Sequence, residues 1–275
     1  MFFICPKCSG ELNISESGAA ACPKGHSYDK SRFGYYNLLL SERGGTHGDN
    51  KEMVMARREF LGGGFYEPLA SAIADICDRV LPQCGVVLDA GCGEGYYTRH
   101  VKSRLSGKNA RVCAFDISKD AVKEAAKKHS ADEYAVAGSY HMPIADGSVD
   151  LLLNTFSPLA ADETRRVVKS GGYFVMAIPA EEHLFGLKAK IYDTPYRNTV
   201  EDTSLEGFCL VDKREIRYTL ELTDNESIKS LFMMTPYAYR TNREGRGRIL
   251  SLPELVTEVH FLILVYKKTE PCAIK

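Results

Sequence analysis

The sequence predicts an α/β protein with a small metal-binding module at its N-terminus. Three observations support this fold class. From residue 86 onward, short apolar runs typical of buried strands alternate with helical patterns. A glycine-rich turn follows the first of these runs, and a Cys and His quartet with metal-ligand spacing lies near the start of the chain. At 275 residues, the chain is long enough for one large domain and an accessory module.

The N-terminal segment carries CPKC and then CPKGH. Cys5 and Cys8 fit one tight turn, and Cys22 and His26 fit a second, so together they complete a tetrahedral Zn²⁺ shell. Protein fills all four positions, which predicts a structural rather than a catalytic zinc. The alternative, unrelated buried cysteines, is disfavoured because the segment is short and polar. We expect residues 1–37 to form a zinc module whose core is separate from that of the large domain.

Residues 38–65 are predicted to be a linker that ends in a helix. The stretch 41–50 is polar, glycine-rich and without periodicity, and a helical pattern over 51–61 stops at three glycines. Apolar residues then recur at helical spacing over 66–81, which predicts an amphipathic helix at the start of a domain spanning 66–275.

The first strand of that domain ends in a glycine-rich turn, within VVLDAGCGEGYYT. Its notable residues are Asp89, Gly91, Gly93, Glu94 and Gly95. A dinucleotide turn places a diphosphate on a helix N-terminus, where two carboxylates would repel it. Carboxylates suit a ligand that carries an ammonium and a sulfonium, so the turn predicts a site for S-adenosylmethionine. The alternative is a tight strand-to-helix turn in an unrelated α/β protein.

A second strand, RVCAFD, ends in Asp116. A carboxylate at the tip of the second strand of an open α/β sheet hydrogen-bonds the ribose hydroxyls of a bound nucleotide. The alternative for Asp116 is a cap of the helix that follows.

The remaining elements continue the alternation of strand and helix. Strands are predicted at 86–90, 111–116, 133–137, 149–154 and 172–178. Helices are predicted at 95–105, 118–129 and 159–169. Two long strand-like runs, 208–222 and 258–267, predict an antiparallel pair at one edge of the sheet.

Composition limits the class of protein. The net charge is −1, so any nucleic acid would have to meet local basic patches rather than a global field. Outside the quartet, the cysteines show no paired spacing and are expected to be reduced. No signal peptide or membrane-spanning run is evident, which predicts a cytoplasmic protein.

The zinc-ligand spacing, the helical linker, LDAGCGEGYYT and the tail segment MTPYAYR together resemble the bacterial RlmA-type family of 23S rRNA guanine-N1 methyltransferases. The resemblance covers the chain from Cys5 to about Tyr266. It implies a class I, Rossmann-like methyltransferase domain with a mixed seven-stranded sheet. It also implies methyl transfer from S-adenosylmethionine to guanine N1 in a stem-loop of large-subunit rRNA, and a homodimer.

The resemblance assigns cofactor contacts to Tyr66, Gly93, Glu94 and His183. Ordinary helix packing is the alternative for Tyr66. His183 lies beyond the strand at 172–178, on the side where such sheets bind ligands, although a lone histidine is more often a surface or capping residue. Ser139, past the third strand, is placed near the adenine.

The loop after the fourth strand, NTFSP, faces the methyl group in class I folds. Asn154 and Phe156 are therefore candidates to hydrogen-bond and stack a flipped base. His183 and Glu94 are candidates to accept the proton of guanine N1.

RNA contacts are predicted in two places. The zinc module offers basic and aromatic side chains, namely Lys7, Lys24, Lys30, Arg32, Phe33, Tyr35 and Tyr36. The tail offers an arginine cluster, Arg240, Arg243, Arg246 and Arg248, which is alternatively a solvated helix face. Two other functions remain open: a tRNA or small-molecule methyltransferase whose zinc module serves stability only, and a non-catalytic zinc protein that binds RNA.

Overall fold

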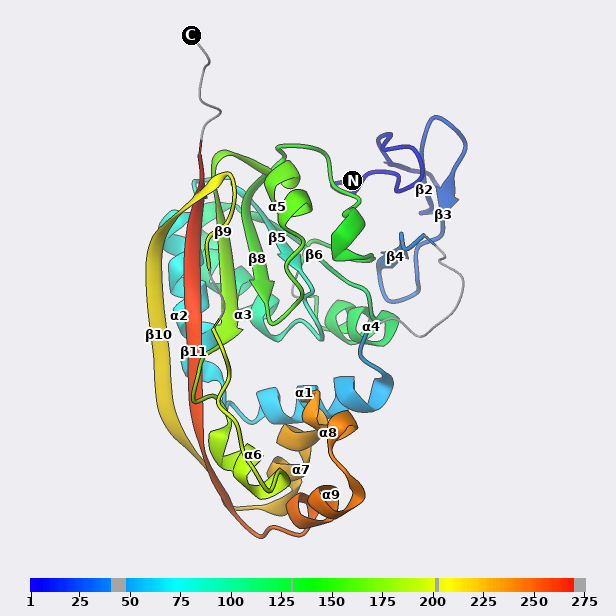
Figure 1. Cartoon of the computed structure of the whole chain (residues 1–275). Coiled ribbons are helices and arrows are strands. Elements are labelled where there is room, and N and C mark those ends of the chain that lie inside the picture. Colours follow the sequence, from blue (N-terminus) through cyan, green and yellow to red (C-terminus); the bar gives the residue numbers. More distant parts are fainter. Residues whose placement is uncertain (41–47, 130, 201–202, 270–275) are drawn as a thin grey trace.

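The computed structural model describes residues 1–40, 48–129, 131–200 and 203–269. Within these ranges the central feature is one sheet of eight strands in the order β10-β11-β9-β8-β5-β6-β7-β4 (Figure 1). Its strands are β4 (Tyr35–Asn37), β5 (Val86–Ala90), β6 (Arg111–Asp116), β7 (Glu133–Val136), β8 (Val149–Thr155), β9 (Val168–Pro179), β10 (Phe208–Leu222) and β11 (Leu255–Lys268).

The sheet is mixed, as predicted. Strands β4 to β9 run parallel, whereas β11 pairs antiparallel with both β9 and β10. All seven strands predicted after residue 66 are present with small differences at their ends. The predicted count of seven is nevertheless wrong for the whole sheet, because β4, from the zinc module, adds an eighth strand beside β7.

Alternate residues of the strands feed two cores. Val87, Val112 and Leu151 face α2 (Glu67–Val80) and α3 (Tyr96–Arg104). Their neighbours Leu88 and Phe115 face the opposite side, which α5 (Ala161–Val167) covers in part. Helix α4 (Lys119–Lys127) packs near the β7 edge, on the α3 side. Two short 3₁₀ helices, Leu105–Lys108 and Ser139–His141, complete the connections.

The zinc module contributes to the second core. It contains a small antiparallel sheet of β1 (Asn13–Ile14), β2 (Ala20–Ala21) and β3 (Ser27–Tyr28). Phe3 and Leu12 are buried in the same cluster as Leu88, Phe115 and Phe174 of the large domain. The predicted separate core is therefore wrong: the module packs on the same face of the sheet as α5 and shares its core.

Backbone contacts reinforce this attachment. The Phe2 N–H donates to both carboxylate oxygens of Glu133, at 3.0 and 2.9 Å. The Ile4 N–H donates to the Pro143 carbonyl at 2.8 Å, and the Leu38 N–H continues the β4–β7 pairing by donating to the Val136 carbonyl at 2.9 Å.

A group of helices lies beyond the carboxyl ends of the strands (Figure 1). Its members are α1 (Lys51–Gly62), α6 (Phe185–Ile191), α7 (Asn225–Met233), α8 (Tyr237–Arg240) and α9 (Arg243–Leu250). Helix α1, predicted as the end of a linker, packs against α7, where Ser230 Oγ donates to Glu59 Oε2 at 3.2 Å. The linker residues 41–47 lie outside the described residues. Within the described ranges no helix has the length and apolar character needed to cross a membrane.

Candidate functional site

The four predicted zinc ligands converge. The Sγ atoms of Cys5, Cys8 and Cys22 and a ring nitrogen of His26 all lie within 4.8 Å of one another. His26 Nδ1 is 3.4 Å from the Sγ atoms of both Cys5 and Cys22. These separations fit a tetrahedral Zn²⁺ with Zn–S bonds of about 2.3 Å. Because protein side chains supply all four ligands, the zinc has no open coordination position for a reacting group, so it is structural.

A fifth side chain supports the quartet. The Tyr28 hydroxyl lies 3.3 Å from Cys5 Sγ, where it can donate to the thiolate. Gly25, whose φ is +81°, permits the tight turn between Cys22 and His26.

The glycine-rich turn sits at the carboxyl end of β5, next to β8, where the strand order reverses. Gly91, Gly93 and Gly95 all have positive φ, of 85°, 56° and 84°. A Cβ on Gly91 would overlap the side chain of Ser157, in the loop after β8. The chain therefore needs glycine here both for its backbone conformation and for the close approach of the two loops. A switch point of this kind is the usual ligand crevice of an open α/β sheet.

Asp116 holds the turn from the neighbouring strand. Its Oδ2 accepts the Gly93 N–H at 2.9 Å, and its Oδ1 accepts the Ser118 N–H at 2.8 Å. The N-cap of α4 is Ser118, whose Oγ accepts the Ala121 N–H. Asp116 thus does not cap the helix itself. Burial raises the pKa of Asp116, against the effect of these two backbone donors.

Two further carboxylates are buried near the turn and incompletely paired. Asp89 Oδ2 accepts the Thr98 hydroxyl at 2.6 Å, whereas Asp89 Oδ1 has no partner among the described residues. Burial raises the pKa of Asp89 to about 7. Glu94 Oε2 pairs with Lys128, whereas Glu94 Oε1 has no partner among the described residues. A buried acceptor without a donor is costly. Glu94 lines the cavity described below and Asp89 does not, so Glu94 Oε1 is the atom suited to a cationic ligand.

A cavity of about 880 Å³ opens over the turn, between the strand ends and the helices α1, α7 and α8. Eight of the predicted site residues line it: Tyr66, Gly91, Gly93, Glu94, Asp116, Ser139, Phe156 and His183. Three do not line it, namely Asp89, Gly95 and Asn154. Asn154 shapes the wall instead, because its Oδ1 accepts the Ser157 N–H at 3.2 Å and its Nδ2 donates to the Pro158 carbonyl at 3.3 Å.

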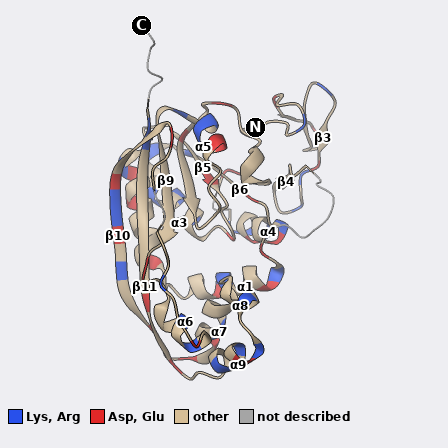
Figure 2. Ribbon diagram, viewed as in Figure 1, with Lys and Arg blue, Asp and Glu red and all other residues tan. Residues whose placement is uncertain are grey.

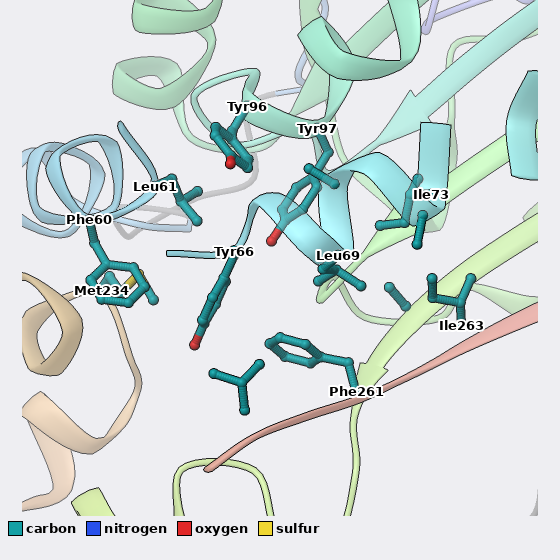
Figure 3. Close-up of a cluster of buried hydrophobic side chains, with 14 of the residues drawn as sticks. Phe60, Leu61, Tyr66, Leu69, Ile73, Tyr96, Tyr97, Met234, Phe261 and Ile263 are labelled. Carbon is teal, nitrogen blue, oxygen red and sulfur yellow. The ribbon is translucent and has the colours of Figure 1, made fainter. Parts of the chain in front are cut away.

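Aromatic side chains form one wall of the cavity. Tyr66 stands between Phe60 and Phe261, with ring centroids 5.1 and 5.0 Å away (Figure 3). The hydroxyls of Tyr66 and Tyr97 are buried without a partner among the described residues. Tyr66 therefore packs as a core residue and also offers a donor to the cavity. The sequence did not point to Tyr97 or Phe261, since only tertiary packing brings them here.

His183 lies against this wall. Its ring centroid is 4.2 Å from that of Phe261, and its Nδ1 accepts the His260 N–H at 3.4 Å. Burial lowers the pKa of His183 to about 3. The ring is therefore neutral near pH 7, and because Nδ1 accepts, the proton lies on Nε2. Such a ring is a hydrogen-bond donor to the cavity and a poor proton acceptor.

These groups fit S-adenosylmethionine. The ligand carries an ammonium and a sulfonium, and Glu94 Oε1 on the cavity lining is a buried acceptor without a partner among the described residues. Its ribose hydroxyls suit the Asp116 carboxylate at the tip of β6.

Comparison with known proteins supports both sites. Residues 88–176 match the family described as a methyltransferase domain, and residues 3–42 match the N-terminal zinc ribbon of RlmA. A methyltransferase domain of this kind uses S-adenosylmethionine, and the ribbon holds zinc.

Individual relatives extend the match to almost the whole chain. The 23S rRNA (guanine(748)-N(1))-methyltransferase of Streptomyces fradiae is 31% identical and covers 94% of this chain and 95% of that protein. A Micromonospora griseorubida protein, provisionally named 23S rRNA (guanine-N(1)-)-methyltransferase, is 33% identical and covers 92% of each. By contrast, a malonyl-[acyl-carrier protein] O-methyltransferase of Hamiltonella defensa is 28% identical and covers 60% of this chain and 69% of that protein. The chain therefore belongs to the family of 23S rRNA (guanine-N1)-methyltransferases.

Proposed function

We propose that this protein transfers a methyl group from S-adenosylmethionine to N1 of a guanine in 23S rRNA. The observation that carries the proposal is the match to relatives named for this activity over more than nine-tenths of the chain, zinc ribbon included. An O-methyltransferase activity is less well supported, because the relative named for it covers a much smaller share of the chain.

Phe156 supports a nucleobase substrate. It lies in the loop after β8, its backbone has a left-handed φ of 59°, and 42% of its surface is exposed. Its ring leans on Phe261 and Tyr97, with centroids 5.0 and 6.0 Å away. A large apolar residue in a strained conformation at the edge of a cavity is suited to stacking on a base turned out of its helix.

The bound cofactor would supply an activated methyl group, so the chain's own residues have to align the guanine and handle its N1 proton. The Phe156 ring would orient the base. The Nε2 proton of His183 suits binding rather than proton acceptance. Glu94, the other candidate base, has a buried Oε1 on the cavity lining without a partner among the described residues, but that atom suits a cation of the cofactor, so we assign the N1 proton to neither residue.

Two basic surfaces support RNA as the substrate. On the zinc module, the Arg32 guanidinium lies 4.8 Å from the centre of the Phe33 ring, and Lys123 of α4 lies 5.3 Å from the same ring. Figure 2 shows further Lys and Arg on α9, at the end of the molecule away from the module. Together the two surfaces suit an RNA stem-loop that spans the cavity mouth.

A homodimer, which the family resemblance implies, and a cytoplasmic location, which cysteines without paired spacing favour, complete the proposal. Light scattering of the purified protein tests the dimer, with a monomer mass at micromolar concentration as the contrary result.

Primer extension on 23S rRNA tests the activity. RNA from a deletion strain, treated with protein and S-adenosylmethionine, should give a new reverse-transcriptase stop, because N1 methylation blocks the Watson–Crick edge. Phe156→Ala should weaken the stop while cofactor affinity, measured by calorimetry, stays within about twofold. No stop in rRNA but methyl incorporation into tRNA would replace this function with tRNA methylation. No incorporation into any RNA, with RNA still bound, would indicate a non-catalytic protein.

A further inference from the structure

The cavity has an uneven distribution of charge. Three carboxylates line it, those of Asp49, Glu94 and Asp116. Among the described residues of the lining, Arg57 is the single Lys or Arg. Arg57 belongs to α1, outside the glycine-rich turn and the β6 tip that carry the carboxylates Glu94 and Asp116.

Arg57 is held close to the glycine-rich turn. Its Nη1 lies 4.0 Å from the position that a Cβ on Gly93 would occupy. The same Nη1 pairs with Asp49, and Nη2 donates to the Met234 carbonyl at 3.1 Å. These contacts use part of the five N–H donors of a guanidinium and fix its plane. The remaining donors stay available on a side chain that is 29% exposed.

The residues around Arg57 are themselves fixed. The Asp49 carbonyl accepts the Ser118 hydroxyl at 2.6 Å, and Gly48 approaches Ile117 so closely that a Cβ there would lie 2.7 Å from the Ile117 side chain. The segment before α1 is thereby attached to the tip of β6, beside Asp116. Burial raises the pKa of Asp116, and the Arg57 charge opposes this rise, in keeping with their proximity.

S-adenosylmethionine carries an ammonium, a sulfonium and one anionic group, its α-carboxylate. The carboxylates of the cavity can serve the two cations, but they repel the anion. In a partly enclosed site, a carboxylate is bound most strongly by a guanidinium, through charge-assisted and often bidentate hydrogen bonds.

We propose that Arg57 binds the α-carboxylate of S-adenosylmethionine and so selects the cofactor by its amino-acid end. This inference rests on the cofactor of the proposed function, and it adds a residue of α1 to the binding site.

The test compares two ligands that differ only in this group, S-adenosylmethionine and decarboxylated S-adenosylmethionine, by calorimetry. Wild-type protein should bind the former about 10 to 100 times more tightly. In Arg57→Met this preference should fall to within about threefold, because affinity for the complete cofactor drops while affinity for the decarboxylated one is unchanged. Arg57→Lys should keep part of the preference.

The matched control is Arg58→Met. Arg58 is the next residue of α1 but pairs with Glu124 at 3.0 Å, outside the cavity lining. The Arg58→Met variant should keep the full preference for S-adenosylmethionine over its decarboxylated form.

Three outcomes would overturn the inference. Arg57→Met could lower the affinity for both ligands equally, which would mean that Arg57 only holds α1 and Asp49 in place. It could leave both affinities unchanged and weaken RNA binding instead, which would make Arg57 an RNA contact. The wild type could also bind both ligands equally. Failure of the wild type to bind either ligand would instead count against the proposed function, and with it the inference.

Discussion

The Gly93 N–H donates to Asp116 Oδ2 at 2.9 Å, so the tip of β6 is bonded directly to the glycine-rich turn after β5. Two segments that each look like a separate ligand motif in the sequence are therefore one unit. Asp116 positions the turn through one oxygen and also lines the cavity.

Asp116→Ala should weaken S-adenosylmethionine binding by about 1.5–3 kcal/mol, roughly 10- to 150-fold, because charge-assisted hydrogen bonds to the ribose are lost and the turn loosens. Asp116→Asn should lose less of the cofactor affinity, since an amide oxygen can still accept the Gly93 N–H. Calorimetry measures both. An unchanged affinity in the alanine variant would leave Asp116 with a purely structural role.

Metal analysis should find one zinc per chain. The Cys8→Ser variant should lose this zinc. Because Phe3 and Leu12 share a core with the large domain, the variant should also unfold at a lower temperature. We expect its midpoint of thermal unfolding to fall by at least about 4 °C, which corresponds to some 2 kcal/mol. Cys209→Ser, an exposed cysteine on β10, is the matched control and should keep both zinc and midpoint. A zinc-free wild type would contradict the assignment. A zinc-free variant with an unchanged midpoint would contradict the shared core.

Asp89 should make the unliganded protein less stable as the pH rises from about 4 to 7. The pKa of Asp89 is about 7 in the folded state, against roughly 3.9 in an unfolded chain, so in this window the folded state binds the extra proton. The unfolding free energy should therefore fall by up to about 1.4 kcal/mol per pH unit and level off above pH 7.

Denaturant titrations at several pH values measure this effect. Asp89→Asn should gain stability over the wild type as the pH rises to 7, because the amide carries no charge. A pH-independent difference between Asp89→Asn and the wild type would show that Asp89 is ionised throughout.

The arginine cluster divides into two kinds of residue. Arg248 donates to the Ile191 carbonyl at 2.8 Å and pairs with Asp193 and Glu244, so it serves the packing of α9 on α6. Arg240 and Arg243 are exposed. Charge reversal of these two, Arg240→Glu with Arg243→Glu, should weaken binding to a 23S rRNA fragment and reduce its salt slope by about two units, one for each lost phosphate contact.

Cofactor affinity should not change in that double variant. Arg79→Glu with Arg104→Glu, exposed on α2 and α3, is the charge-matched control and should bind RNA almost as the wild type does. If both double variants lost the same amount of RNA affinity, the loss would come from the change in net charge. The arginine cluster would then not be an RNA-binding surface.

The parts of the site that the sequence predicts are those made by local chemistry. Ligand spacing in a tight turn brings Cys5 and Cys8 together, and a strand followed by glycines places Gly93 and Asp116 at one edge of the sheet. Such patterns are short, and the backbone geometry they require is the same wherever they occur.

What the sequence misses depends on tertiary packing. Helices α6 to α9 are each nine residues or fewer, too short for a clear apolar period, and helices of this length are stabilised mainly by their neighbours. Arg57 looks like a solvent-facing charge on α1 until α7 and the β6 tip are placed beside it. The three residues of β4 give no strand pattern, so the joining of the two modules is visible only in the fold.

The parallel pairing of β4 with β7 limits how this family can diversify. An N-terminal ribbon joined only by a flexible tether could be exchanged freely between relatives. Here residues 35–37 are part of the catalytic domain's own sheet, and Phe2 and Ile4 bond to residues around β7. A chimaera that takes its ribbon from another member should therefore fold only if it also takes the matching surface of β7, so the two pieces have to change together.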